Sequence, residues 1–153
     1  MITLRNTQAS THGSIGINTS KAYLQQIYHI RQELKVLTRK REQIQSELYA
    51  VRSPQLGERV LSSGGGDQMI RLIAKAEKMT AKITARTGEL EKLREEIEAQ
   101  IQKVPHPKYR QVLSYRYELC MRWEDIAEDM NVSVRYIYKL HGRALAAFDK
   151  VVH

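Results

Sequence analysis

The chain has 153 residues, enough for one ordinary domain or two small ones. Charged residues make up 27% of it and aromatic residues 7%, a composition that suits long exposed helices better than a large compact core. The net charge of +8 favours a polyanionic partner. A single cysteine, Cys120, excludes an intrachain disulfide and a multi-cysteine metal site, and we expect it to pack in a helix core. Because the sequence shows neither a signal-peptide pattern nor an apolar run of the roughly 18 residues that a membrane span needs, we expect a cytoplasmic protein without a membrane partner.

Residues 1–19 are rich in Ser, Thr, Asn and Gly and show no sustained period, which predicts a disordered tail. Ser20 is a good N-cap residue, and we expect it to begin a helix that runs to about Val51. The apolar residues of this helix alternate three and four positions apart, which is a heptad seam interrupted once at Arg41. We interpret the basic run 39–41 as a solvated face, with phosphate contact as the alternative.

A linker over residues 52–66 is predicted next, because Pro54 and three consecutive glycines end helical structure. The glycines do not fit a phosphate-binding loop, since Asp67 follows them instead of Gly-Lys-Ser/Thr. Asp67 is expected to cap a second helix that runs to about Lys103 and also carries a seven-residue apolar repeat. Two helices of similar length predict a long antiparallel hairpin, a coiled coil, over residues 20–103. The same seams would also fit a homo-oligomer.

The segment 104–107, Val-Pro-His-Pro, breaks the second helix and predicts a separate domain over residues 104–153. A helix from Lys108 to about Met121 is expected to support this domain through Tyr109, Val112, Leu113, Tyr117 and Leu119.

Residues 123–145 indicate two short helices around a tight turn. Asn131 suits a left-handed turn position, and the Ser133 hydroxyl is placed to cap the second helix. Apolar residues line one face of each helix, namely Ile126, Ala127 and Met130 on the first and Ile137 and Leu140 on the second. The sequence therefore predicts an all-α fold that ends in a helix-turn-helix, a motif whose second helix enters the major groove of DNA.

The outer face of that second helix carries cations and hydrogen-bonding groups but no carboxylate, since no acid lies between Asp129 and Asp149. A solvated face would mix signs, so we interpret it as a surface for double-stranded DNA, with a plain packing helix as the alternative. We expect Arg135 and Lys139 to contact base edges, because both side chains suit guanine O6 and N7. The other predicted DNA-binding residues, contacting mainly phosphates, are Ser133, Val134, Tyr136, Tyr138, His141 and Arg143.

Several short segments match a known pattern: Val112-Leu113 with Arg116-Tyr117, Asp125-Ile126-Ala127, Ser133 with Ile137, and Arg143-Ala144-Leu145. Through these segments the chain resembles the fourth conserved region of bacterial sigma-70-type transcription factors. Over residues 20–150 it is similar to small regulators encoded by phages and prophages of Gram-positive bacteria. The resemblance implies contact with RNA polymerase at a promoter. The chain departs from the pattern at Arg122-Trp123, where a capping Ser or Thr is common, and at Val134, where a polar residue is usual.

No arrangement of residues suggests catalysis, because the five histidines are scattered and the acidic run 95–98 belongs to a solvated helix. We therefore expect no enzyme, no metal and no cofactor. The leading hypothesis is a sequence-specific transcriptional regulator in a bacterial host cell, without the region that melts promoter DNA. One alternative is a DNA-packaging protein like a small terminase, which should form a large ring. The other is a coiled-coil scaffold that does not bind DNA, for which charge reversal at Arg135 and Lys139 should change nothing.

Overall fold

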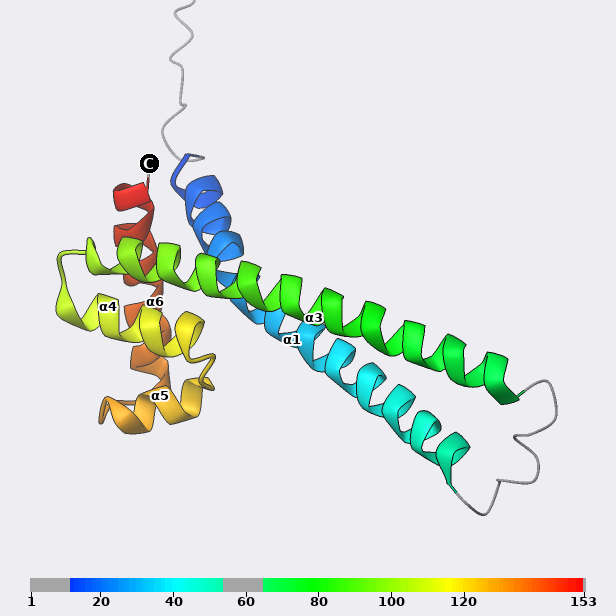
Figure 1. Cartoon of the computed structure of the whole chain (residues 1–153). Helices are drawn as coiled ribbons and strands as arrows, with labels where there is room; N and C mark the ends of the chain where they lie inside the picture. Colours follow the sequence, from blue (N-terminus) through cyan, green and yellow to red (C-terminus); the bar gives the residue numbers. More distant parts are fainter. Residues whose placement is uncertain (1–11, 54–64, 153) are drawn as a thin grey trace, which may run out of the picture. The chain divides into compact units, whose positions relative to one another are not determined.

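The computed structural model describes residues 12–53 and 65–152, with side-chain surroundings from residue 19 onward. Within these residues the chain is helical and contains no strand (Figure 1), which confirms the all-α prediction. The described chain divides into two compact units. We call residues 12–28 together with 92–152 the C-terminal unit, and residues 29–53 together with 65–91 the hairpin unit.

Two long helices supply most of the chain: α1 spans His12–Arg52 and α3 spans Gly65–Gln102. The prediction that Ser20 begins the first helix is wrong, since the helix already includes residues 12–19, and the predicted tail is described only in that part. Ser20 is buried, and its hydroxyl donates a hydrogen bond to Asp149 Oδ1 at 2.7 Å instead of capping a helix. Asp67 lies in the first turn of α3 and not at its cap. Residues 54–64 of the predicted linker lie outside the described residues.

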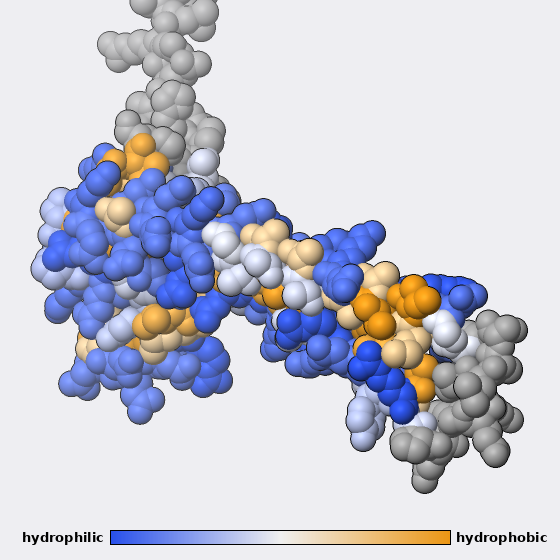
Figure 2. Space-filling model, in the orientation of Figure 1, coloured by the Kyte–Doolittle hydropathy of each residue, from blue (hydrophilic) through white to orange (hydrophobic). Residues whose placement is uncertain are grey.

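In the hairpin unit α1 and α3 lie side by side and run in opposite directions (Figure 1), as predicted. Arg86 on α3 joins Glu33 on α1, with 3.0 Å between Arg86 Nε and Glu33 Oε2. Among the described residues of this unit only Leu72 is buried, at 6% exposed, because two helices cover each other on one side only. Apolar side chains therefore reach the surface where α1 ends and α3 begins, next to residues 54–64 (Figure 2). The half-buried seam residues include Ile30, Leu34, Leu37, Ile44, Leu48, Val51, Met69, Ile73, Ile83 and Leu90.

The single helix predicted over residues 108–121 is shorter and changes its winding. It consists of α4, Pro107–Leu113, followed by a π-helical turn, η2, Ser114–Glu118. The chain then turns at Cys120, whose φ of 55° lies in the left-handed region. Cys120 is thus half-buried in a turn and not in a helix core, and Leu119 is 54% exposed and supports nothing, contrary to both expectations. Arg116 stabilises this turn, because its Nη1 donates to the Met121 carbonyl at 2.7 Å.

Helices α5, Trp123–Asp129, and α6, Val134–Val152, complete the C-terminal unit. Helix α6 packs against α4 and α5. The core of this unit also takes fully buried side chains from the long helices: Leu24 and Ile27 from α1, Ile97 and Ile101 from α3. The described residues of the segment predicted as a separate domain, 104–152, therefore lie within a larger compact unit that includes one end of each long helix.

Candidate nucleic-acid interface

The turn between α5 and α6 has the geometry of a helix-turn-helix. Asn131 has a φ of 53°, as its residue type predicted, and its N–H donates to the Glu128 carbonyl at 2.9 Å. The next N–H, of Val132, donates to the Ala127 carbonyl at 2.9 Å. Ser133 then caps α6, since its Oγ accepts a hydrogen bond from the Tyr136 N–H at 3.2 Å. The predicted turn and cap are both confirmed.

The apolar faces of the two motif helices meet as predicted. Ile126 and Ile137 are fully buried, and Leu140 is 3% exposed. Ala127 is 4% exposed, and its small side chain allows close approach of the helices. Burial of these residues fixes the rotation of α6 about its axis, so the opposite face of α6 is exposed.

That exposed face brings together most of the residues predicted to contact DNA. Arg135, Lys139 and Arg143 are exposed and are spaced four residues apart, so they share one side of α6. Tyr136 and Tyr138 flank them and are 39% and 52% exposed. At the helix start Ser133 is exposed and Val134 is half-buried. No carboxylate belongs to α6 before Asp149, so the face is positively charged over its first four turns.

His141 does not belong to this face. It is 8% exposed, and its Nε2 lies 2.8 Å from the Tyr117 hydroxyl. Burial, with the nearby charges of Lys21 and Arg116, lowers the pKa of His141 to about 4, so the ring is neutral at pH 7. Burial likewise raises the pKa of Tyr117 to about 12. His141 is thus a hydrogen-bonded core residue, and its prediction as a phosphate contact is corrected.

An aromatic cluster supports the exposed Tyr138 on α6, and the sequence did not predict this cluster. The Trp123 ring lies 5.2 Å from the Tyr138 ring and 4.8 Å from the His141 ring, between centroids. The Arg116 guanidinium covers Trp123 at 4.3 Å from its ring centroid. The only signal in the sequence was that Trp123 departs from the expected pattern. The cluster connects the η2 turn, the start of α5 and the recognition face of α6.

Arg122, the other departure, is the N-cap residue of α5 and makes no side-chain capping bond. Its guanidinium instead donates to both carboxylate oxygens of Asp125, at 3.1 and 3.0 Å. This hydrogen bonding lowers the pKa of the Asp125 carboxyl. The first turn of α5 thus carries an exposed ion pair where a capping hydroxyl would otherwise lie.

Further along α6, Arg143 and Lys150 line a shallow groove beside the start of α4. Its remaining lining consists of Pro105, Tyr109, Ala146, Ala147 and Val151, without a carboxylate. The positive face of α6 therefore continues past the first two turns, which carry Arg135 and Lys139. The part of the chain that the structure describes contains no cluster of three or more potential metal ligands. None of its helices is long and apolar enough to cross a membrane.

Residues 94–148 match the Sigma-70, region 4 family. The matched region-4-like segment runs from the last turns of α3 through α4, η2 and α5 into α6, so it covers most of the C-terminal unit without its α1 residues. Comparisons with curated proteins and with solved structures gave no match. The sequence resemblance between Leu113 and Leu145 is confirmed at the level of the domain. The C-terminal unit contains a DNA-binding helix-turn-helix of the sigma region 4 type, a domain associated with transcription.

Proposed function

We propose that this protein is a sequence-specific regulator of transcription that has no catalytic activity of its own and reads duplex DNA through α6. The observation that carries the proposal is the exposed, carboxylate-free face of α6 within a region-4-like helix-turn-helix. A helix that only packed would be expected to show a mixture of charges on its solvated side.

The side chains on this face divide into two roles. Arg135 and Lys139 lie in the first two turns of α6, where a recognition helix meets base edges, and would donate to guanine O6 and N7. Tyr136, Tyr138 and Arg143 would contact phosphates and so fix the register of the helix in the groove. The N-terminus of α6, capped by Ser133, offers further N–H groups to a phosphate.

The place of action follows from the same domain. We propose that the protein acts at promoters together with RNA polymerase in the cytoplasm of a bacterial host, and that it is encoded by a phage or prophage. The region 4 match supports the link to polymerase, and the resemblance of residues 20–150 to phage regulators supports the origin.

The hairpin unit would join copies of the protein into a homo-oligomer. Its support is the seam of α1 and α3, which stays half-buried within one chain and would be covered by a second hairpin in a four-helix arrangement. Light scattering of the purified protein should give the mass of a dimer. A monomer or a large ring would contradict this arrangement.

The decisive experiment is selection of bound sequences from a random duplex library. Wild-type protein should enrich a shared motif, and the double variant R135A/K139A should lose it. A matched double variant on α1, K35A/R39A, removes the same charge from exposed positions outside α6 and should enrich the same motif as the wild type. If wild-type protein enriches nothing and its binding only fades with added salt, the proposed function is wrong.

A further inference from the structure

One face of α3 in the hairpin unit carries a row of four exposed cations: Arg71, Lys75, Lys78 and Lys82. They precede Arg86 by fifteen, eleven, eight and four residues, spacings that return to the same side of a helix. Among the described residues none of the four has an ion-pair or hydrogen-bond partner. We call these four residues the α3 cation row.

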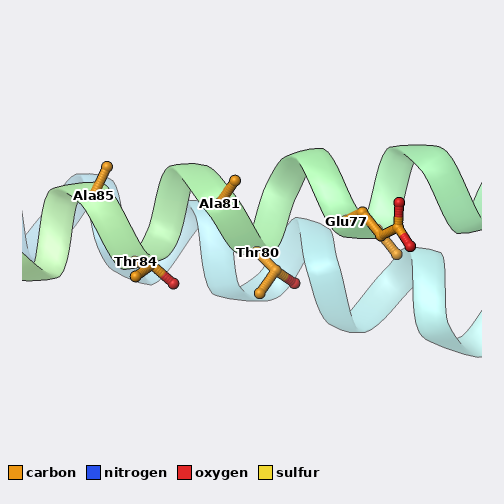
Figure 3. A pocket seen from close by; sticks show the side chains of 6 residues that line it. Glu77, Thr80, Ala81, Thr84 and Ala85 are labelled. Carbon is orange, nitrogen blue, oxygen red and sulfur yellow. The ribbon is translucent and has the colours of Figure 1, made fainter.

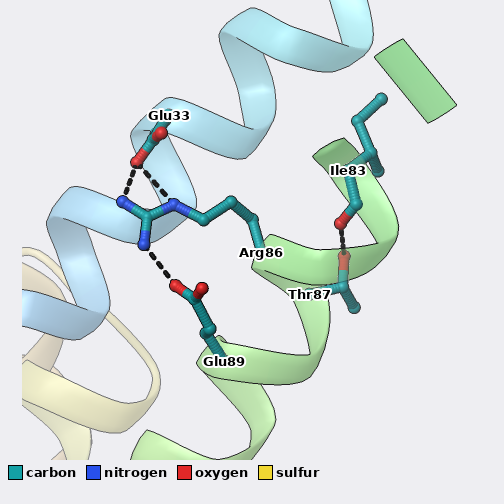
Figure 4. A network of polar contacts seen from close by, with 5 residues as sticks. All are labelled: Glu33, Ile83, Arg86, Thr87 and Glu89. Atoms are coloured by element: carbon teal, nitrogen blue, oxygen red, sulfur yellow. Dashed lines mark hydrogen bonds and ion pairs between the residues drawn. The ribbon is translucent and has the colours of Figure 1, made fainter. Parts of the chain in front are cut away.

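Arg86 shows how a cation on this face is neutralised within the chain. Its guanidinium joins Glu33 on α1 and Glu89 on α3 (Figure 4). These hydrogen bonds raise the pKa of Arg86 and lower that of Glu33. The cation row continues from Arg86 toward residue 65, where Asp67 lies four residues before Arg71. Among the described residues no carboxylate forms an ion pair with the row, so most of its charge is left for another molecule.

Helix α1 does not neutralise the row either. Lys40 follows Glu33 by seven residues and so lies on the same side of α1 as the Glu33–Arg86 pair, where it adds an exposed cation. The acid on this side, Glu47, follows Glu33 by fourteen residues and accepts a hydrogen bond from Gln43 at 3.3 Å. The Gln43 amide is uncharged, so Glu47 stays negative and offsets only Lys40, and this side of the hairpin keeps the net positive charge of the row.

The distribution of charge on α3 is unlike that of an ordinary solvated helix. Glu77 is the sole acid between Asp67 and Glu89, and it lies away from the row, in a shallow concavity of small side chains (Figure 3). Lys78 and Lys82, like Arg71 and Lys75, are four apart, and each such like-charged pair lowers helix stability. A stable solvated face would instead alternate Glu with Lys. The row thus costs folding stability and has no partner within the described chain.

We propose that the α3 cation row binds the phosphate backbone of duplex DNA, without regard to sequence, as a second contact surface in addition to α6. Eleven residues of helix place its ends about 16 Å apart. Duplex DNA carries one negative charge per about 1.7 Å of its axis, so the row faces several phosphates at once. The choice of duplex DNA as the polyanion rests on the proposed function, whereas the row itself is independent of α6.

The test is the triple variant K75Q/K78Q/K82Q, which keeps α6 intact. Its binding to the selected duplex and to random duplex should weaken equally, by about tenfold or more at low salt, because phosphate contacts carry no sequence information. The slope of log K against log salt should become shallower by about 2 to 3, close to one for each lost contact. The same motif should still be enriched from the random library.

Two controls separate a local contact from general attraction. K75R/K78R/K82R keeps every charge and should bind like the wild type. K35Q/R39Q/K92Q removes three exposed cations elsewhere and should keep most of the affinity and the slope. Circular dichroism and the fluorescence of Trp123 verify that each variant folds.

An unchanged slope in K75Q/K78Q/K82Q, or an equal loss in K35Q/R39Q/K92Q, overturns the proposal. Loss of binding to an acidic protein while duplex affinity stays intact would also overturn it and assign the row to that partner. Failure of the proposed function is distinguishable, because it removes motif enrichment but leaves the effect of the row on random duplex measurable.

Discussion

His141 and Tyr117 form a neutral buried pair inside the C-terminal unit, with 2.8 Å between Nε2 and the hydroxyl oxygen. Burial lowers the pKa of His141 to about 4 in the folded chain, whereas in the unfolded chain the same imidazole has a pKa near 6.5. Between these two pKa values the unfolded chain binds more protons than the folded chain. The free energy of unfolding is therefore highest above pH 6.5 and decreases as the pH falls toward 4.

We therefore predict that the free energy of unfolding falls by about 2 kcal/mol between pH 7 and pH 5. Urea titrations followed by the fluorescence of Trp123, the single tryptophan, measure it directly. H141F should be less stable at pH 7, because the Tyr117 hydroxyl then lacks its buried partner, but its stability should depend less on pH. Equal pH dependence in the two proteins would show that His141 does not titrate in this window.

Arg135 and Arg143 share the exposed side of α6 but should behave differently when truncated. R135A should cost about 1–3 kcal/mol on the selected duplex and relax the preference at one base position. R143A should weaken all duplexes nearly equally, because a phosphate contact does not distinguish sequences. Binding curves on a set of single-base variants of the selected site give both results. Equal loss on every duplex for R135A would remove it from base readout.

At the scale of the element, α5 begins without a capping hydroxyl. Arg122 is its N-cap residue and forms an exposed pair with Asp125. Both R122A and R122S lose this pair, but the serine supplies an oxygen to the free N–H groups of the first turn. We predict that R122S is more stable than R122A by about 1 kcal/mol. Thermal melts of the two variants measure the difference, and equal melting temperatures would mean that the α5 terminus is satisfied without a cap.

The elements of the motif were predictable because their signals are local. Asn131 and Ser133 each determine the conformation or hydrogen bonding of residues within a few positions, and the apolar spacing defines the buried faces of α5 and α6. The η2 turn was not predictable in this way. It depends on Arg116, which reaches the Met121 carbonyl and the face of Trp123, and on the i→i+5 bond from the Leu119 N–H to the Ser114 carbonyl.

The error at His141 also arose because its hydrogen-bond partner is distant in the sequence. As a polar residue within a basic segment it matched the expected phosphate contacts, and its true partner is 24 residues away. Helical spacing alone places His141 beside the exposed Tyr138 as readily as beside the buried Leu145, and only the packing of Tyr117 and Trp123 decides between them.

At the scale of the whole molecule, the first turns of α1 contribute to the stability of the C-terminal unit. Leu24 is fully buried in that unit, although it lies far from the motif in sequence. L24A should destabilise the unit by about 2–5 kcal/mol, as expected for a large-to-small change in a core. The transition monitored by Trp123 fluorescence should shift to lower urea. L48A in the half-buried seam is the matched control and should shift that transition less. An unshifted transition in L24A would exclude α1 from this core.

This long-range organisation could not be read from the sequence. The apolar spacing does not change where the C-terminal unit ends and the hairpin begins, so it marks both long helices but not the unit to which each turn belongs. The hydrogen bond from Ser20 to Asp149 joins residues that are 129 positions apart. The sequence alone predicted Ser20 to be the cap of its own helix, which is a local role.

The division of the chain has a consequence for how its length can vary. The C-terminal unit is discontinuous, and the hairpin of residues 29–91 is an insertion between its two segments. The Glu33–Arg86 pair sets the register of the two arms, so residues 34–40 face residues 79–85. Deleting residues 34–40 and residues 79–85 together would shorten each helix of the hairpin by about 10 Å and would preserve the seam and its facing positions. Because the deleted residues all belong to the hairpin unit, such a deletion should leave the residues of the C-terminal unit unchanged, although it would remove Lys82 from the α3 cation row.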